Sequence, residues 1–445
     1  MNAPTPPPGR PARPAGSAAT TPGTSPTAQA GPAAAGRGRA VPLAAVTADP
    51  TTVLPGLWRE HGPLAPVELE PGVPAWLVMG YRELLTITKD EERFSRDARN
   101  WRAYQDGSVP ADSPLGPMMF PRDNVIGFDG GEHRRLRRPL QDAIASIDHR
   151  RLRHTVERLC TDLIAGFAVQ GHADLVADYA AAIPALSIGE LIGLDPEQAR
   201  ELLAAMHLLF SSGPRAQEGN ARFEAVLGAL FGSRLTHRRD DLTSFLIDHP
   251  DLHTDSEVVQ TIVVLVSAGK HTSISWISQT LRMLLSDPRF AGQVRGGQLP
   301  IDNALDEVLA VLPPMINMPA RYALADTKLS GRVIARGDAL ILGLGGAARD
   351  PRVHDDLWWT NDNRANLAWS AGPHACPARD PARTIARTAI ATAQHLLPDM
   401  ELACPPGAIT ALPSPWTAIP TRLPVTFTAA PTPVAPAPPG RHARL

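Results

Sequence analysis

The sequence predicts a mainly α-helical domain that carries small β-sheets. Seven segments repeat apolar residues three and four positions apart, the period of a helix that buries one face: 134–144, 151–167, 196–210, 222–235, 255–285, 301–312 and 378–397. Four shorter segments bounded by Gly, Pro or Asp favour strands, and all lie late in the chain: 321–324, 332–334, 339–342 and 424–428. Together the patterns indicate a helical body with minor sheets and no internal repeat.

The segment 255–285 has clear signals at both ends. Thr254 is a suitable N-cap, acidic residues follow it in the first turn, and Asp287 with Pro288 stops the helix. A helix of this length spans about 50 Å and crosses a whole domain. Gly269 interrupts it at a cost of about 1 kcal/mol against alanine, so we expect a packing or functional reason, such as a flat cofactor lying against the helix.

Composition limits the class of protein. A chain of 445 residues with 43% hydrophobic content can bury a large core, and a formal net charge of -2 argues against a nucleic-acid partner. Cys160, Cys376 and Cys404 lie far apart, which argues against disulfides and structural zinc and favours a reducing compartment. No apolar run approaches the roughly 20 residues of a membrane span. We therefore expect a cytoplasmic protein with no transmembrane segment.

Both ends of the chain are rich in Pro, Ala and Gly. Residues 1–42 and 431–445 have too few apolar residues to offset the entropy of ordering, so we expect disordered tails around one domain at 43–430. The N-terminal end also contains arginine and no acid, as a transit peptide does. Its many prolines argue against that alternative, because a transit peptide forms an amphipathic helix.

The most informative stretch reads Trp-Ser-Ala-Gly-Pro-His-Ala-Cys and ends at Cys376. It places the cysteine behind a Gly-Pro turn and before the helix expected from residue 378. The first N–H groups of that helix point at the sulfur, which lowers the pKa of the thiol and favours metal ligation. Haem iron is a metal that takes such a ligand. The alternative is a buried and inert cysteine.

This stretch resembles the haem-binding loop of the cytochrome P450 family. Four further blocks resemble the family's C helix, I helix, K helix and the segment beyond K, in family order: 132–138, 268–272, 306–310 and 347–351. The resemblance covers roughly residues 46–427. It implies the cytochrome P450 fold, a triangular helical prism with haem b between the I and L helices, and it implies that Cys376 binds the iron.

The resemblance also implies roles for individual residues. The implied haem-binding residues are His133, Arg137, Arg321, Trp369, Gly372, His374 and Cys376, of which the cysteine is the metal ligand. His133 and Arg137 lie four apart on one helix face and are expected to contact a haem propionate. The implied catalytic residues are Ala268, Gly269, His271 and Thr272, with Thr272 as a hydrogen-bond donor to bound oxygen. A solvated helix face explains the neighbouring arginines Arg134, Arg135 and Arg138.

Two motifs depart from the family pattern. His271 stands where an acid usually relays protons, and Ala310 stands where an arginine usually pairs with Glu307. A second arginine usually completes that pair, and Leu357-Trp358-Trp359 stands near its place. We expect Glu307 to be protonated, solvated or paired with another arginine, Arg349 or Arg364. Some actinobacterial members share the Ser-Ala-Gly-Pro-His-x-Cys-Pro-Ala loop and an altered K-helix motif, and this chain resembles them most. They include members encoded beside small GTPase signalling modules, which makes signalling-module proteins candidate partners.

The function implied by the resemblance is a monooxygenase that oxidises a hydrophobic small molecule with O2. No dinucleotide, flavin or iron-sulfur motif is fused to the chain, so we expect electrons from a separate ferredoxin and ferredoxin reductase. His271 and the missing arginines leave two alternatives open. One is a haem protein that does not oxygenate and acts as a sensor or partner in a signalling complex, and the other is a haem-thiolate isomerase or coupling enzyme.

Overall fold

The computed structural model describes residues 40–209, 215–353 and 365–430. Most of the two expected tails, at 1–42 and 431–445, therefore lies outside the described residues. Val41–Pro42 is an exception, because it forms strand β1 and pairs in parallel with strand β2, Leu64–Glu70. The expected boundary at residue 42 is thus corrected: the folded part includes residue 41.

Helices make up most of the described chain. All seven helical segments expected from periodicity lie within a helix, with differences of one residue at some ends, because each buries one apolar stripe. The helices are α1 Leu43–Ala48, α2 Pro50–His61, α3 Tyr81–Lys89, α4 Arg102–Gln105, α5 Gly116–Met119, α6 Gly130–Ala145, α7 His149–Phe167, α8 Ala182–Ile192, α9 Pro196–Leu209, α10 Ala216–Thr236, α11 Leu242–Ile247, α12 Asp255–Ser286, α13 Pro288–Arg295, α14 Ile301–Val311, α15 Leu344–Ala347 and α16 Arg379–Leu396.

The described strands form three small sheets. The largest has the order β1-β2-β3-β9-β6-β4, and the others have the orders β10-β11-β5 and β7-β8. The remaining strands are β3 Val73–Val78, β4 Phe94–Ser95, β5 His172–Asp174, β6 Met318–Ala323, β7 Thr327–Leu329, β8 Arg332–Ile334, β9 Ala339–Leu342, β10 Glu401–Leu402 and β11 Pro424–Thr426. The four expected strands are present as β6, β8, β9 and β11, whereas β2 and β3 were not expected.

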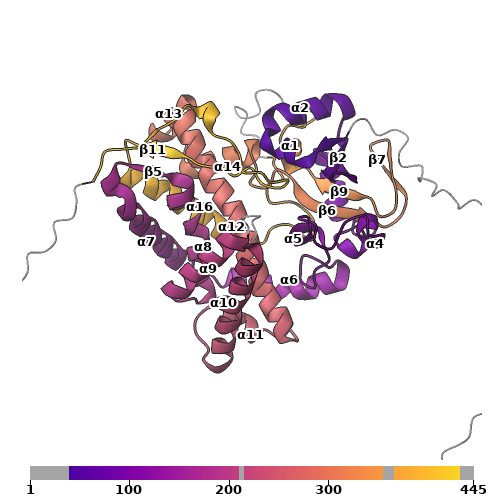
Figure 1. The fold of residues 1–445 in the computed structure, drawn as a ribbon, viewed down its shortest axis with the longest axis horizontal. Coiled ribbons are helices and arrows are strands. Elements are labelled where there is room, and N and C mark those ends of the chain that lie inside the picture. Colours follow the sequence, from indigo (N-terminus) through magenta and orange to yellow (C-terminus); the bar gives the residue numbers. More distant parts are fainter. Residues whose placement is uncertain (1–39, 210–214, 354–364, 431–445) are drawn as a thin grey trace, which may run out of the picture. The chain divides into compact units, whose positions relative to one another are not determined.

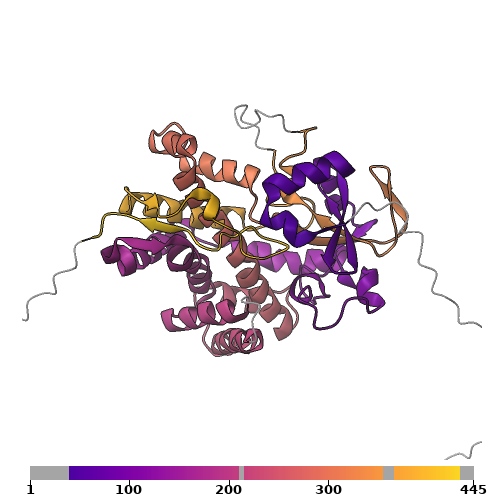
Figure 2. The same cartoon turned by 45° about the horizontal axis from the view of Figure 1, so that its top comes forward.

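The sheet and the long helices occupy different parts of the fold. Figure 1 shows the largest sheet together with α1 and α2 on the right and most of the long helices on the left, and the turned view in Figure 2 keeps this separation. One core cluster packs the sheet against α1 and α2. Another joins α7, α12, α14 and α16 and includes the fully buried Ile277 and Ala386. The expected mainly helical class with small sheets is confirmed.

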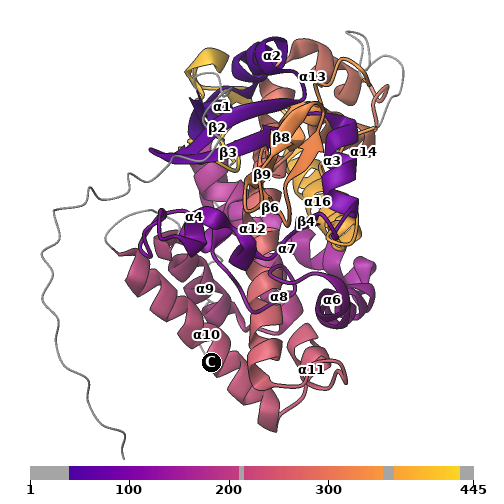
Figure 3. The same ribbon diagram turned by 90° about the vertical axis from the view of Figure 1, so that its right-hand side faces the viewer.

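Helix α12 is the longest described element and runs through the helical part (Figure 3). The Thr254 side chain caps it by accepting a hydrogen bond from the Glu257 N–H at 3.2 Å, and the helix ends at Ser286, before Asp287. It packs against α8, α14 and α16. Both expected end signals are confirmed, and α12 connects the core around α16 with the core around α9 and α10.

One described helical stretch, Leu175–Ile192, has the length and apolar composition of a membrane span. Of its residues, 67% are buried inside the fold. Tyr179 and Ile183, for example, are fully buried in the core with α12 and α16. A stretch that packs its apolar residues into the protein interior is typical of a core helix.

Candidate active site around Cys376

The loop before α16 folds back on itself and fixes the cysteine backbone. The Cys376 N–H donates to the Trp369 carbonyl at 2.9 Å, and the Ala375 N–H donates to the Gly372 carbonyl at 3.0 Å. Gly372 has a φ of 70°, which glycine adopts without strain. A Cβ at Gly372 would also overlap the carbonyl oxygen of Thr88 at the end of α3. The loop therefore requires glycine here for its turn and for its close approach to α3.

Cys376 lies three residues before α16, as expected. Burial raises the pKa of its thiol, against lowering contributions from the Ala378 backbone N–H, Arg137 and Arg379. The expected stabilising groups are therefore present, but the expected net lowering of the thiol pKa is wrong because burial outweighs them. A bound metal ion deprotonates a thiol outright, and the same N–H and cations then stabilise the thiolate.

Trp369 connects the loop to the core. Its ring meets the Trp276 ring of α12 edge to face, with centroids 5.4 Å apart and an angle of 79° between the planes. The Trp276 indole donates to the Leu305 carbonyl of α14 at 3.1 Å. This pair holds the start of the Cys376 loop against two helices of the core.

His133 and His374, which are 241 positions apart in the sequence, lie together in the fold. Their rings stack with centroids 3.9 Å apart. His374 Nε2 is 3.3 Å from Asp129 Oδ1, while neither ring nitrogen of His133 has a hydrogen-bond partner among the described residues. Burial, together with neighbouring arginines, lowers the pKa of His133 to about 4. Both rings are therefore neutral at one buried place: the N–H of His133 has no acceptor among the described residues, whereas the N–H of His374 is engaged by Asp129.

Two arginines complete this group. Arg321 of β6 is fully buried, and none of its three guanidinium nitrogens has a partner within the described part of the chain. Burial and the neighbouring charge of Arg96 lower the pKa of Arg321 to about 9. Arg96 is also buried; one of its nitrogens donates to the Ala320 carbonyl at 3.2 Å, and its Nε has no described partner. Buried guanidinium groups without partners are costly unless an anion pairs with them.

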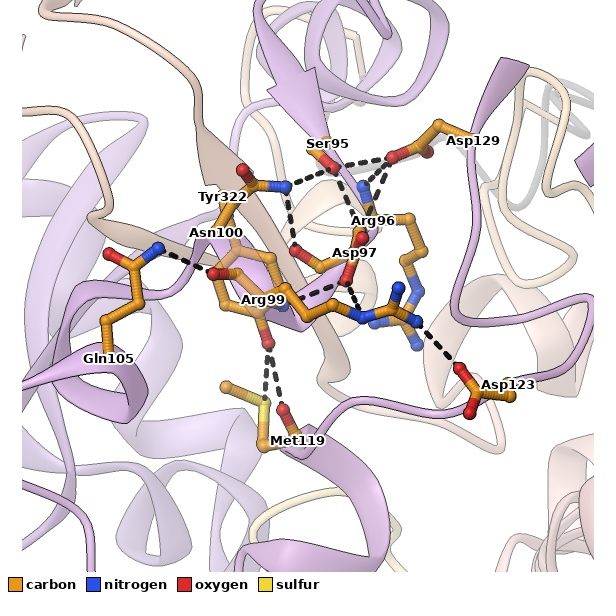
Figure 4. A network of polar contacts seen from close by, with 10 residues as sticks. All are labelled: Ser95, Arg96, Asp97, Arg99, Asn100, Gln105, Met119, Asp123, Asp129 and Tyr322. Carbon is orange, nitrogen blue, oxygen red and sulfur yellow. Dashed lines mark hydrogen bonds and ion pairs between the residues drawn. The ribbon is translucent and has the colours of Figure 1, made fainter. Parts of the chain in front are cut away.

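Asp129 organises the loop that carries Arg96, as Figure 4 shows. Its Oδ2 accepts hydrogen bonds from Ser95 Oγ at 2.6 Å and from the Arg96 backbone N–H at 2.8 Å. Burial raises the pKa of Asp129, but the hydrogen bonds from His374, Ser95 and Arg96 outweigh it and hold that pKa far below its usual range. Asp129 is therefore ionised, and it aligns the Arg96 loop with His374.

Glu91, His133 and His374 lie close enough to share a metal ion, since one ligand atom from each falls within 4.8 Å of the others. The surrounding charge argues against a cation there. Burial lowers the pKa of His374 to about 3 against the hydrogen bond to Asp129, and Arg321 and Arg96 add to the lowering because they repel positive charge at its ring. A site with these guanidinium groups favours an anion, and two carboxylates of haem fit the unpartnered donors.

Arg137 lies on α6 and reaches the Cys376 loop. Its guanidinium donates to the Ala375 carbonyl, and its Nε has no partner in the described residues. The other arginines of α6 face outward: Arg135 pairs with Glu132 and Glu257, Arg138 pairs with Asp251, and Arg134 is exposed. Arg134 and Arg138 thus lie on the exposed face, as expected, whereas Arg135 is half-buried in its ion pairs.

On α12, Ala268 is exposed and His271 and Thr272 are half-buried, so this face borders accessible space. Thr272 Oγ1 donates to the Ala268 carbonyl at 2.9 Å. Burial, with a contribution from Lys270, lowers the pKa of His271 to about 4. The imidazole is therefore neutral near pH 7, with one N–H and one acceptor nitrogen.

Gly269 lies where α12 packs against a neighbouring helix. A Cβ at this position would lie 2.7 Å from Cδ1 of Ile188 on α8. Since α8 and α12 pack together, the glycine allows the close approach of two helices. Packing is therefore one reason for the glycine, and contact with a flat cofactor stays a prediction.

Glu307 has a partner that was not among the two candidates. Arg289 of α13 donates to it, whereas Arg349 donates to the Gly345 carbonyl, and Arg364 lies outside the described residues. Its neighbour Asp306 accepts from Arg383 of α16. The neighbouring acids Asp306 and Glu307 thus pair with arginines of two different helices.

Sequence reasoning missed Arg96 and Asp129 at this site. Asp129 directly precedes α6, which is a capping position, but no cap hydrogen bond is made by its side chain. Its partners lie more than thirty positions away, at Ser95 and Arg96. No local pattern marks Arg96, because only the three-dimensional neighbourhood of Arg321 and His374 reveals its role.

Known proteins resemble this chain over most of its length. No family model matches it. It is 31% identical to 2-hydroxy-5-methyl-1-naphthoate 7-hydroxylase of Streptomyces carzinostaticus, in an alignment that covers 78% of this chain and 87% of the relative. It is 28% identical to cytochrome P450 monooxygenase PikC of Streptomyces venezuelae, in an alignment that covers 80% of this chain and 86% of the relative. Among solved structures, CYP154A1 from Streptomyces coelicolor A3(2) has a TM-score of 0.76 and 30% identity, covering 85% of this chain and 98% of that chain. The chain therefore belongs to the cytochrome P450 family and is an oxidoreductase of the monooxygenase class.

Proposed function

We propose that this protein hydroxylates or otherwise oxidises a hydrophobic small molecule, using O2 and electrons from a separate ferredoxin and ferredoxin reductase. One observation carries the proposal: buried donors without described partners gather beside the loop of Cys376. Arg321 is the strongest of them, because it is fully buried and unpartnered within the described residues. A protein that enclosed no anion there would leave this charge uncompensated.

The group that fits is haem b, with Cys376 as the ligand of its iron. The residues proposed to hold its propionates are His133, Arg137, Arg321 and His374, together with Arg96. Gly372 and Trp369 shape and anchor the loop that carries the cysteine. Bound through a thiolate, haem supplies the activation of O2 and the transfer of one oxygen atom to the substrate.

The residues of α12 handle protons and water. The hydroxyl of Thr272 donates to the Ala268 carbonyl, so its oxygen can accept a hydrogen bond from a water molecule. To act as the expected donor to bound oxygen, the hydroxyl would turn away from that carbonyl. His271 is neutral near pH 7 and can accept a proton at one nitrogen while it donates from the other. We assign to His271 the relay that an acid performs in most relatives.

We infer the substrate class from two segments that lie side by side. Met315 and Thr417 form an isolated β-bridge, and the Asn317 N–H donates to the Trp416 carbonyl at 3.2 Å, so the two segments 315–318 and 414–418 lie side by side. They contain mostly apolar side chains, which suits a hydrophobic ligand. The relatives support this class, since one is named as a hydroxylase of a methylated naphthoate.

Electrons are proposed to enter from the side of the Cys376 loop. Exposed cations there include Arg134 and Arg138 on α6 and Arg379 at the start of α16. Such a surface favours an acidic electron carrier such as a ferredoxin. A cytoplasmic location, where ferredoxin and reductase are available, is part of the same proposal.

The test is spectroscopic first and catalytic second. The purified protein is loaded with haem, reduced and exposed to carbon monoxide, and the expected Soret band is that of a thiolate ligand. Cys376→Ala should lose this band, whereas Cys404→Ala, which changes a cysteine outside the site, should keep it. Ferredoxin-supported reactions with a panel of apolar substrates should then give hydroxylated products.

Two outcomes would overturn the proposal. A wild-type protein without the thiolate band would remove the haem assignment. A protein with the band that binds apolar ligands but consumes oxygen without forming product would instead support the sensor or signalling alternative.

A further inference from the structure

Away from the donors described above, one ion cluster joins four separate parts of the fold. Arg352 follows α15, and its Nη2 donates to Asp350 Oδ2 at 2.7 Å and to Glu83 Oε2 at 2.6 Å. Its Nη1 donates to Glu83 Oε1 at 3.0 Å, so the pairing with Glu83 is bidentate. The guanidinium also lies over the Trp58 ring of α2, with Cζ 5.3 Å from the ring centroid. We call Glu83, Asp350 and Arg352 the Arg352 cluster.

The two carboxylates of the Arg352 cluster have little access to water. Asp350 is fully buried and Glu83 is 7% exposed. Burial raises the pKa of each carboxyl group, but the hydrogen bonds from Arg352 outweigh it and lower both pKa values. Those same bonds raise the pKa of Arg352. All three groups of the cluster are therefore charged at neutral pH, and removal of Arg352 would leave two buried carboxylates without the cation that compensates them.

The Arg352 cluster fixes the beginning of α3. Asp350 Oδ2 accepts from the Tyr81 N–H at 2.9 Å and so caps the helix from a distant segment. Glu83, in the first turn of α3, also accepts a hydrogen bond from Ser330 Oγ in the β7–β8 turn. Helix α3 makes no cap through its own preceding residue, Gly80. Its start is thus held by groups from elsewhere in the chain.

The other end of α3 lies against the Cys376 loop. The Thr88 carbonyl oxygen approaches Gly372 too closely to admit a Cβ there. Leu84 and Ile87 of α3 share a core cluster with Leu367, and Ala371 of the loop packs against the same cluster. Figure 3 shows α3 at the margin of the sheet, beside β8 and β4. A short rigid helix therefore connects the Arg352 cluster to the loop that carries the cysteine.

We propose that Arg352 is a positioning residue for Cys376, acting through α3. The cluster fixes the register of α3, and Thr88 at the far end of α3 fixes the turn at Gly372. This turn then sets the direction from which the Cys376 sulfur would approach the haem iron. The inference rests on the proposed haem-thiolate function, and it assigns to α3 a part of the support that the K-helix ion pair provides in relatives.

The test compares Arg352→Gln with Arg234→Gln in the haem-loaded full chain. Arg234 is a suitable control because it also bridges two segments: it lies on α10, pairs with Asp241 and donates to the Gly193 carbonyl. Its side chain is 4% exposed, whereas that of Arg352 is 37% exposed. Both variants should lose global stability in denaturant melts. In mild denaturant, below the unfolding transition, Arg352→Gln should lose the thiolate band of the reduced carbon-monoxide complex roughly tenfold faster than the wild type, as a modest reduction of the barrier predicts. Arg234→Gln should lose it at the wild-type rate.

Each result has a defined meaning. If both variants lose the band at equal rates, Arg352 serves general stability and the inference is wrong. If the wild type shows no thiolate band, the proposed function itself fails. If Arg352→Gln yields no folded protein, Ser330→Ala is the second variant, because it removes one hydrogen bond to Glu83 and leaves the ion pairs. Ser330→Ala should lose the thiolate band faster than Arg234→Gln. An equal rate in these two variants would overturn the inference.

Discussion

Arg289 Nη2 lies 3.3 Å from Glu307 Oε1 and links α13 to α14. The arginine side chain is 51% exposed and that of the glutamate 15%, so the pair sits at the edge of the protein. Exposed ion pairs contribute little, because solvent screens the charges and ordering two long side chains costs entropy. Glu307 therefore retains a partner without the strong buried pair that its position in the K helix suggests.

Glu307→Gln should change the free energy of unfolding by less than about 1 kcal/mol, because only a peripheral pair is lost. Denaturant melts of the haem-loaded protein measure this. Asp306→Asn is the matched control on the same helix. It removes the partner of Arg383, which also donates to the Asp302 carbonyl, so it should cost about 1–3 kcal/mol. Equal losses in the two variants would contradict this ranking of the pairs.

Gly269→Ala tests whether packing requires the glycine. The added methyl group meets Ile188 Cδ1, so the single variant should lose stability. Valine lacks the Cδ1 atom, so the double variant Gly269→Ala with Ile188→Val should regain most of the lost stability. Alanine is favoured over glycine in a helix by about 1 kcal/mol, so the double variant should be at least as stable as Ile188→Val alone. If haem loading falls and Ile188→Val gives no rescue, a cofactor in contact with the glycine is the better explanation.

The fold could be predicted where the controlling interactions are local. Helix α12 is an example, since the cap at Thr254 and the stop at Asp287 lie within a few residues of its ends. Strand β3 was missed because Val73–Val78 is buried at almost every position, so the alternation that marks a half-buried strand is absent. In β2, Val67–Glu70 does alternate apolar and acidic residues, but the run is only four residues long and follows Pro66.

The site could be predicted only in part, for a related reason. Cys376, Gly372 and Trp369 lie in one contiguous stretch whose turn residues and following helix are visible in the sequence. The partners of Arg96 and Glu307 depend on segments brought together by folding, which no local pattern encodes. The thiol pKa was misjudged because the loss of hydration on burial exceeds the effect of the helix N-terminus, and burial depends on the whole fold.

Arg96→Gln tests the residue that the fold adds to the site. If Arg96 pairs with a haem carboxylate, the variant should release haem faster, because the charge that compensates the carboxylate is lost. Transfer of haem to apomyoglobin measures the rate. Arg99→Gln on the same loop is the control, since its ion pair with Asp123 is largely exposed and should not affect release. Equal rates for both variants would remove Arg96 from the proposed set.

His271 should make stability fall on the acid side of neutrality. Its pKa is about 4 in the folded protein and near 6.5 when exposed, so protons bind preferentially to the unfolded chain and stability is lost as the pH falls from about 6.5 towards 4. At pH 5 the loss from this group is about 2 kcal/mol relative to pH 7. Asparagine does not titrate, so the free energy of unfolding of His271→Asn should change between pH 7 and pH 5 by about 2 kcal/mol less than that of the wild type, as denaturant melts at both pH values would measure. An unchanged difference would mean that the histidine is not buried in neutral form.

Gly372→Ala should damage the site more than the fold. A φ of 70° costs an alanine about 1–2 kcal/mol, and its Cβ would also overlap the Thr88 carbonyl oxygen, so the turn must shift away from α3. Because the Cys376 N–H is bonded to the same loop at Trp369, the shift should displace the cysteine and reduce the thiolate band of the reduced carbon-monoxide complex. Gly407→Ala is the control, since a Cβ there meets open space and should leave the band intact. If Gly372→Ala keeps the full thiolate band, the loop tolerates movement at its turn. The contact between α3 and the loop would then have no part in orienting the sulfur.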